Sequence, residues 1–329
     1  MTPPPPRLIV EPDDGLQPVH DFISSAQSTL LIKQFTFTEP SLIEATIGRH
    51  KAGVEVRVML NAKRSGGDRA NDETYEELRA AGIDVQWSSP KFYVTHEKSI
   101  VVDGAAAMVA TYNLMMKYFT LTRDYGIITY DPDHIAQIVE VFNADWGHID
   151  FTPAIDAGLL WSNSNSRFQM ARFIDRATES LLVQHPKFVD AVILDRLIDA
   201  AERGVKVKVL CGGKHGISDW DILDTFSSLR TLRRFDVKVR KQKNLRVHAK
   251  LLLVDGREAL VGSMNIDRSA FDLRRELGVI IDEPEIVDRL RKVFKSDWKG
   301  SHLYEAPDPL GHADHHEDDF PHDHDLVHE

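Results

Sequence analysis

Apolar residues along the chain follow two spacings, one typical of helices and one typical of strands. In residues 168–178 they recur every three or four positions, and residues 19–26 show the same spacing, so both segments are expected to form amphipathic helices. Short runs rich in Leu, Ile and Val follow at 30–35 and 181–185 and predict strands. The alternation of helices and strands indicates an α/β fold with a mostly buried sheet.

Each half of the chain continues with a second helix, a second strand and a buried strand. Gly53 and Gly204 are expected to end the second helices, because glycine is favoured just after a helix C-terminus. The buried strands are each closed by Asp-Gly, a pair typical of hairpin turns. The strands are expected at 54–60, 205–211, 99–102 and 251–254.

The chain repeats itself at a shift of about half its length. Leu30-Leu31-Ile32 matches Leu181-Leu182-Val183, and residues 51–58 match 202–209, both at a shift of 151. From residue 96 onward the shift is 152. Matched blocks in one order over such a length indicate two copies of one half-domain. The copies are expected at 1–152 and 153–304, with the boundary near 151–158.

One repeated block carries His, Lys, Asp and Asn at a fixed spacing, with a hydroxyl residue before the Asn and an acid eleven residues after it. In the first half these residues are His96, Lys98, Asp103, Thr111, Asn113 and Asp124. In the second half they are His248, Lys250, Asp255, Ser263, Asn265 and Glu276.

These residue types suit phosphoryl chemistry. A neutral imidazole can attack phosphorus, and a protonated one can give a proton to the leaving alkoxide. Lys and Asn supply hydrogen-bond donors for the non-bridging oxygens. A carboxylate can bind the far ring nitrogen of each histidine and fix its tautomer. Two half-sites that face each other would place nucleophile and acid on opposite sides of phosphorus.

The spacing resembles the HKD motif of the phospholipase D superfamily, His-x-Lys-x4-Asp-x6-Gly-Ser-x-Asn. The second half matches at every position, whereas the first has Ala110 for Gly and Thr111 for Ser. The resemblance extends from about Leu8 to Trp298. It implies an α/β fold of two tandem, pseudo-symmetric half-domains, each a mixed β-sheet flanked by helices, with the active site between them.

The resemblance also implies roles for the repeated residues. His96 would be the nucleophile and His248 the general acid, through a phosphohistidine intermediate and without metal or cofactor. Asp103 and Asp255 belong to the catalytic motif but are expected in turns behind the strands. Lys98, Lys250, Asn113 and Asn265 would bind phosphate with help from Thr111 and Ser263, and Asp124 and Glu276 would orient the histidines.

Members of the superfamily differ in substrate, and they include phospholipases, cardiolipin and phosphatidylserine synthases, and nucleases. Residues 265–276 are similar to the Asn-x-Asp-x-Arg-Ser-Phe-x-Leu-Asn-x-Glu stretch of bacterial cardiolipin synthases, with one residue fewer before Arg. This similarity favours a phospholipase D-type phosphodiesterase or phosphatidyltransferase that acts on phospholipids. A metal-independent nuclease and a non-catalytic module that binds phosphate, nucleic acid or membrane remain alternatives.

Two charged segments bear on the partners. Residues 230–246 hold eight Lys or Arg, which suits either anionic headgroups and nucleic acid or a solvated surface. Residues 305–329 hold nine of the 51 acids and no Lys or Arg, so without them 42 acids face 40 bases and the net charge of −11 does not oppose an anionic substrate. This tail is expected to be disordered, although its histidines also allow metal capture. These are His312, His315, His316, His322, His324 and His328.

The remaining composition describes an ordinary globular protein. Cys211 is the only cysteine, so no internal disulfide can form, and it is expected in the core. No apolar run reaches the roughly 18 residues that span a bilayer. A cytoplasmic protein with at most peripheral membrane contact is expected. Because one chain holds both motifs, a dimer is not needed to complete the site.

Overall fold

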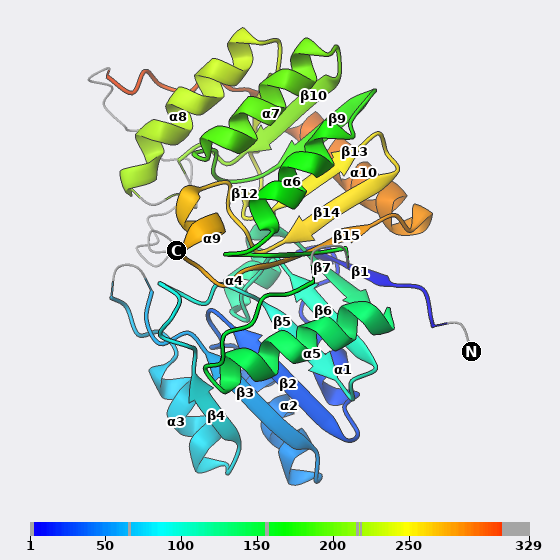
Figure 1. The fold of residues 1–329 in the computed structure, drawn as a ribbon, viewed down its shortest axis with the longest axis vertical. Helices are drawn as coiled ribbons and strands as arrows, with labels where there is room; N and C mark the ends of the chain where they lie inside the picture. Colours follow the sequence, from blue (N-terminus) through cyan, green and yellow to red (C-terminus); the bar gives the residue numbers. More distant parts are fainter. Residues whose placement is uncertain (1–2, 65–66, 155–157, 215–216, 218, 311–329) are drawn as a thin grey trace.

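The computed structural model describes residues 3–64, 67–154, 158–214, 217 and 219–310, and it divides into two similar halves (Figure 1). The first half contains β1 (Arg7–Glu11), α1 (Gln17–Ser24), β2 (Thr29–Gln34), α2 (Pro40–Lys51), β3 (Glu55–Leu60), α3 (Asp72–Ala80), β4 (Asp84–Trp87), β5 (Ser99–Val102), β6 (Ala106–Ala110), α4 (Met116–Thr120), β7 (Thr122–Thr129) and α5 (Pro132–Trp146). The second half contains β8 (Leu159–Trp161), α6 (Ser166–Asp175), β9 (Ser180–Gln184), α7 (Ala191–Glu202), β10 (Lys206–Cys211), α8 (Asp219–Arg234), β11 (Lys238–Lys241), β12 (Arg246–Val247), β13 (Leu251–Val254), β14 (Glu258–Gly262), α9 (Arg268–Asp272), β15 (Leu277–Ile281), α10 (Pro284–Gly300) and β16 (His302–Leu303).

The two sheets have the same strand order. The first runs β1-β7-β6-β5-β2-β3-β4, and the second runs β8-β15-β14-β13-β9-β10-β11 with β16 added at its edge. In each sheet the central strands pair in parallel, as β2 does with β3, and the hairpin strands pair antiparallel. The predicted fold of two pseudo-symmetric half-domains with mixed sheets is confirmed.

Three apolar cores hold the layers together. One lies between the first sheet and α1, α2 and α3, and an equivalent core lies between the second sheet and α6, α7 and α8. The third is central: it joins the inner faces of both sheets to Phe142 of α5 and Phe294 of α10. Because the strands are buried on both faces, they are continuous apolar runs rather than alternating ones. This explains why the sequence pattern marked them clearly.

The elements expected from the sequence are present with small shifts at their ends. The predicted helices 19–26 and 168–178 form as α1 and α6, each beginning two residues earlier and ending two or three residues earlier. Gly53 and Gly204 follow the ends of α2 and α7 with φ of 92° and 87°, a backbone region that favours glycine. The strands at 99–102 and 251–254 have the predicted bounds.

The acidic tail is divided between described and undescribed residues. Ala306 is buried, and Glu305 forms an ion pair with Arg233 of α8 at 3.1 Å, so the first residues assigned to the tail pack against the second half. Residues 311–329, with the six predicted tail histidines, lie outside the described residues. Within the described ranges, no helix combines the length and apolar character that crossing a bilayer requires.

The two halves exchange short backbone segments at their junction. β12, from the second half, pairs in parallel with β7 of the first sheet. The equivalent residue of the first half, Thr95, forms a parallel bridge with Arg275 beside β15. Each of these segments leads directly into a His-x-Lys pair, so the exchange carries both histidines to the junction.

Candidate active site at the junction of the two halves

The backbone of each histidine is anchored on the opposite half. The N–H groups of His96 and Glu97 both donate to the carbonyl oxygen of Arg275, at 2.8 and 2.9 Å. The N–H groups of His248 and Ala249 both donate to the carbonyl of Arg123, at 3.3 and 2.8 Å. The positions of the two imidazoles therefore depend on how the halves dock.

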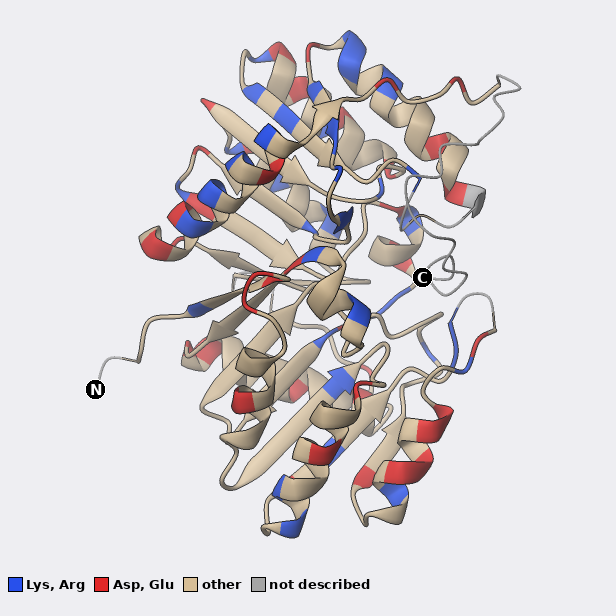
Figure 2. Cartoon of the chain, turned by 180° about the vertical axis from the view of Figure 1, so that it is seen from behind, with Lys and Arg blue, Asp and Glu red and all other residues tan. Residues whose placement is uncertain are grey.

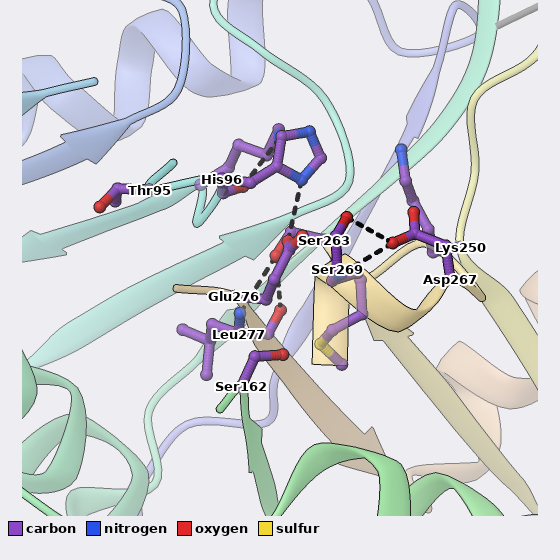
Figure 3. Close-up of polar contacts among 12 residues, drawn as sticks. Thr95, His96, Ser162, Lys250, Ser263, Asp267, Ser269, Glu276 and Leu277 are labelled. Atoms are coloured by element: carbon purple, nitrogen blue, oxygen red, sulfur yellow. Dashed lines mark hydrogen bonds and ion pairs between the residues drawn. The ribbon is translucent and has the colours of Figure 1, made fainter. Parts of the chain in front are cut away.

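The His96 side chain contacts an acid from the second half (Figure 3). Its Nδ1 lies 2.9 Å from Oε2 of Glu276, and both side chains are fully buried. Its Nε2 is buried and has no hydrogen-bond partner in the described part of the chain. Burial, together with Lys98 and Arg274, holds the pKa of His96 well below its ordinary value. A neutral imidazole with Nδ1 bound to Glu276 presents its Nε2 lone pair for attack.

The His248 side chain makes the reciprocal contact with an acid from the first half. Its Nδ1 lies 2.7 Å from Oδ1 of Asp124, and its ring packs against Tyr118 of α4 with centroids 4.7 Å apart. Burial lowers the pKa of His248 to about 4, although the Asp124 carboxylate opposes this. The predicted acids thus each contact a histidine, and each reaches the histidine of the other half.

The two acids differ in charge state. Burial raises the pKa of Glu276 to about 7, with Lys98 and Arg274 opposing it. Burial also acts to raise the pKa of Asp124, but the neighbouring His248 and Lys250 outweigh it and bring that pKa below its usual value. Hydroxyls of Thr111 and Thr122 donate to the same carboxylate. Asp124 is therefore the more firmly ionised of the two.

The motif lysines lie beside the histidines. Lys98 Nζ donates to the carbonyl oxygen of His96 at 2.8 Å, and Lys250 Nζ donates in the same way to His248. Lys250 Nζ also lies 2.9 Å from Nε2 of His248. Burial and the neighbouring Lys98 hold the pKa of Lys250 well below its ordinary value. Lys250 Nζ thus lies beside the His248 imidazole, and Lys98 Nζ lies beside the backbone of His96.

The small motif residues support the strands that carry the acids. The Thr111 hydroxyl accepts from the N–H of Tyr125, and the Ser263 hydroxyl accepts from the N–H of Leu277 at 3.1 Å (Figure 3). These hydroxyls are already hydrogen-bonded within the chain, and direct help in phosphate binding stays a prediction for both residues. Asn113 and Asn265 are buried two residues further along, and Oδ1 of Asn265 has no hydrogen-bond partner within the described residues.

The motif glycine of the second half, Gly262, lies where two backbones pack closely, and the first half has alanine at this position. A Cβ on Gly262 would lie 2.6 Å from the Cα of Gly278 across the sheet. In the first half Ala110 pairs with Gly126, and Ala110 is fully buried in the sheet core. The strands at this position therefore lie close enough in the second half to exclude a methyl group, whereas those of the first half leave space for one. The replacement of the motif glycine by Ala110 fits within a regular sheet.

The motif aspartates lie away from the histidines. Asp103 accepts hydrogen bonds from the backbone N–H groups of residues 27–29, and Asp255 from those of residues 178–180. Each follows the strand that His96 or His248 precedes, so about 20 Å of extended chain separates the two motif residues. This corrects their grouping with the catalytic residues: they fix the turn at which β2 or β9 begins.

Two arginines next to the acids form a set of contacts that the sequence did not predict. Arg275 Nη2 lies 2.9 Å from Oδ1 of Asp145 in α5, and Arg123 Nε lies 2.8 Å from Oδ2 of Asp297 in α10. Both ion pairs cross between the halves and are buried. In each half, two neighbouring residues, an arginine and an acid, thus both contact the opposite half. The acid contacts a histidine, and the arginine contacts an aspartate of a helix.

A buried lysine extends this network in the first half. Lys33 Nζ lies 2.8 Å from Oδ2 of Asp145 and 3.0 Å from Oε2 of Glu97, and both Lys33 and Glu97 are fully buried. Glu97 stands between the motif residues His96 and Lys98, at the variable position of the motif. The sequence contained no signal for this pair, because neither residue recurs in the second half.

In the second half, uncharged residues stand at the positions of both Lys33 and Glu97. The counterparts of Lys33 and Glu97 are Gln184 and Ala249. Gln184 Nε2 donates to Oδ2 of Asp297 at 2.9 Å, in the place of the lysine ammonium. An ammonium and a carboxylate are present in one half and both are absent from the other, so each half keeps its buried charge balanced.

The other predicted candidates lie outside this centre. The basic stretch 230–246 covers the end of α8 and all of β11. Figure 2 shows Lys and Arg on the second half, whereas acids lie on α3 of the first half. Part of that charge is neutralised, because Arg230 and Arg233 pair with Asp308 and Glu305. Cys211 is buried, and burial raises the pKa of its thiol to about 11. In the described part of the chain no three His, Cys, Asp or Glu side chains are grouped to hold a metal ion, and reaction without metal stays a prediction.

Comparison with known families gives two matches along the chain. The family model described as "Cardiolipin synthase, PLD-like domain" matches residues 19–146 and 170–298. These segments contain every residue of the two His–acid pairs. The match follows the internal repeat, with one copy in each half.

Individual relatives and structures agree with this match. The major cardiolipin synthase ClsA of Bacillus subtilis is 26% identical over 88% of this chain and 68% of its own length. The cardiolipin synthase of Oceanobacillus iheyensis is 25% identical over 79% of this chain and 60% of its own. The structure of the phosphatidylserine synthase of Haemophilus influenzae Rd KW20 has a similar fold, with a TM-score of 0.75, 13% identity, and coverage of 92% of this chain and 88% of that one. This chain thus spans about two thirds of the length of the cardiolipin synthases it matches.

The pH dependence of turnover should report the ionisation of Glu276. Glu276 must be ionised to accept from Nδ1 of His96, and its pKa is raised to about 7. Turnover of a chromogenic phosphodiester is therefore expected to fall as pH decreases through about 7. Glu276→Gln should be slower and should lack this acid limb, whereas Asp124→Asn should be slower and retain it, because the pKa of Asp124 is lowered. An unchanged limb in Glu276→Gln would contradict the assignment.

The buried pair of Lys33 and Glu97 should show strong coupling in stability. Lys33→Gln alone and Glu97→Ala alone each leave a buried charge uncompensated, and each should lower the free energy of unfolding by about 3 kcal/mol or more. The double variant reproduces Gln184 and Ala249 and should lose much less than the sum. Its remaining cost is about 1 kcal/mol, because the Ser99 hydroxyl loses its acceptor on Glu97. Urea denaturation measures this cycle, and additive losses would show that the two charges act independently.

Proposed function

Because the chain belongs to the family of cardiolipin synthase, PLD-like domains, we propose that it is a phosphodiesterase or phosphatidyltransferase that acts on phospholipids. The observation that carries the proposal is the pair of buried histidines at the junction, each bound through Nδ1 to an acid of the other half. The relatives named as cardiolipin synthases favour a phospholipid over other phosphodiesters. One chain supplies both pairs, so the proposed site needs no second copy.

In the proposed first step, Nε2 of His96 attacks phosphorus and a P–N bond forms while the bond from phosphorus to the leaving alkoxide breaks. His248 gives the alkoxide its proton. Lys98, Lys250 and the two motif asparagines hold the non-bridging oxygens, whose charge must be stabilised. In the second step, water or an alcohol attacks the phosphohistidine, His248 takes the proton of that nucleophile, and His96 is released.

The difference between the two acids supports this assignment of roles. The imidazole beside the firmly ionised Asp124 is the better one to carry a positive charge, which suits His248 as the acid. An arriving phosphodiester anion also favours its protonated form and raises its pKa from about 4. His96 lies beside Glu276, whose negative charge is weaker at neutral pH, and its lowered pKa keeps it neutral for attack.

The direct test is turnover of a phospholipid labelled in its headgroup, with EDTA present. The proposal expects turnover by the wild type, a loss of about a thousandfold or more in His96→Ala and His248→Ala, and no change in His20→Ala, which replaces a half-exposed histidine of α1. Mass spectrometry after acid quench should find the adduct on His96 in the wild type.

Four outcomes would contradict parts of the proposal. Turnover of DNA but not of phospholipid at matched salt would make the protein a nuclease. Binding of either substrate without turnover would leave a phosphate-binding module. An adduct on His248 would reverse the roles of the two histidines, and an adduct on neither would remove the covalent step.

Exposed apolar side chains near the site support peripheral contact with a lipid surface. Tyr93, Met116, Leu121 and Leu273 are each about half exposed, and each stands three residues from a site residue. The N–H of Tyr93 donates to the carbonyl of Leu273, so side chains from the two halves lie next to each other. Large apolar side chains at such exposure contribute to binding at a bilayer interface.

Replacing the two leucines tests this contact. Leu121→Asp with Leu273→Asp should lower affinity for vesicles of phosphatidylglycerol and phosphatidylcholine by about tenfold or more, because apolar area is lost and negative charge is added. Turnover of a water-soluble chromogenic phosphodiester should stay within about threefold of the wild type. Phe235→Asp, which alters an exposed residue just after the end of α8, should leave vesicle binding unchanged. Equal loss of vesicle binding in both variants would locate the membrane contact elsewhere.

A further inference from the structure

Arg274, two residues before Glu276, is a buried cation whose guanidinium has no hydrogen-bonded or ion-paired partner among the described residues. Its side chain is 3% exposed, and its Nε is buried without a hydrogen bond. Within the described part of the chain its guanidinium makes no hydrogen bond or ion pair, and only its backbone N–H is bonded, to the carbonyl of Ser269. Burying an arginine without a partner costs several kcal/mol, so such a group points to an anion that it binds.

The position of Arg274 directs it toward the site. Arg274 directly precedes Arg275, whose carbonyl oxygen holds the N–H groups of His96 and Glu97, and its positive charge opposes the raised pKa of Glu276. The counterpart in the first half is Thr122, whose hydroxyl donates to the Asp124 carboxylate at 2.6 Å. The charge of Arg274 also contributes to the lowered pKa of His96.

Arg274 is the cation that most lowers the pKa of Asp267, but within the described residues no hydrogen bond joins the two side chains. Asp267 already accepts from Lys187 Nζ at 3.1 Å, from the Ser269 hydroxyl at 2.7 Å and from the N–H of Ala270 at 2.7 Å (Figure 3 shows Asp267 beside Ser269). Lys187 itself is held between Asp267 and Asp221, whose Oδ2 lies 2.6 Å from its Nζ. The two carboxylates of this cluster balance the charges of Lys187 and Arg274 together, but within the described residues no carboxylate oxygen accepts from the Arg274 guanidinium, so its N–H donors keep their binding capacity.

The cluster and Arg274 belong to the second half alone. The counterparts of Lys187, Asp267 and Arg274 in the first half are Thr36, Met115 and Thr122. The repeated residues account for one phosphodiester held between two equivalent half-sites. Arg274 is an additional cation on one side of that arrangement, so it breaks the symmetry of the site.

We propose that Arg274 binds a second anionic group of the substrate, a phosphate or a carboxylate, next to the phosphodiester that is cleaved. The inference rests on the proposed function and narrows the substrate to phospholipids whose headgroup carries its own negative charge. A guanidinium binds either anion through two parallel N–H···O bonds, which also fixes the orientation of the headgroup.

The test compares headgroups in Arg274→Gln. With phosphatidylserine, whose headgroup has a carboxylate, and with phosphatidylglycerophosphate, which has a second phosphate, kcat/KM should fall by about tenfold to a hundredfold, mainly through KM. With phosphatidylglycerol, whose headgroup has no further charge, it should change by less than about threefold. Arg274→Lys should recover part of the loss, and Arg257→Gln, which alters an exposed arginine, should behave as the wild type. The substrate with the larger loss identifies the anion.

Two results would overturn the inference. Equal losses for charged and uncharged headgroups would show that Arg274 holds the cleaved phosphate or only supports the site, and no loss for any headgroup would show that it binds no substrate anion. Failure of the proposed function is distinguishable, because the wild type would then turn over none of these lipids. In that case inorganic phosphate should raise the Tm of Arg274→Gln by less than that of the wild type and of His96→Ala, because one of two anion sites is lost, and an equal rise in all three would refute an anion site at Arg274.

Discussion

The site depends on one exchange at the junction: neighbouring residues in each half, Arg123-Asp124 and Arg275-Glu276, both bind the opposite half. The acid binds a histidine, the arginine binds an aspartate of the last helix, and the arginine carbonyl holds the histidine backbone. All of these groups are buried, so a small shift between the halves would leave several charges unpaired at once. The docking geometry and the geometry of the histidines are therefore fixed by the same contacts.

Within this symmetric frame the halves have diverged in charge. The acids differ, as Asp124 and Glu276, and the surrounding pairs differ, as Lys33 with Glu97 against Gln184 with Ala249. A duplicated site in one chain permits this, because each copy can change without changing the other. Burial favours the neutral form of both imidazoles, but Asp124 opposes this at His248, whereas Lys98 and Arg274 add to it at His96. The proposed acid and nucleophile would need a difference in this direction.

Much of the fold was predictable because strands buried on both faces are unbroken apolar runs, and because the repeat was visible at a nearly constant shift. The paired acids were predictable as candidates from their spacing, but their crossing between halves was not, since spacing carries no information on docking. Lys33, Glu97 and Arg274 were missed because each stands at a position where the halves differ, and the repeat directs attention to positions where they agree. The motif aspartates show the converse: Asp103 and Asp255 recur faithfully, yet they hold turns about 20 Å of chain away from the histidines.

The crossed pairs also bear on how the chain acquires reactivity as it folds. A half that has folded before its partner holds a histidine without its acid, and therefore an imidazole whose tautomer and direction are not fixed. The His96–Glu276 pair is completed only when the last strands of the second half, which follow Arg275-Glu276, have docked. Under the proposed function, phosphodiester chemistry would therefore have to await the docking of the two halves.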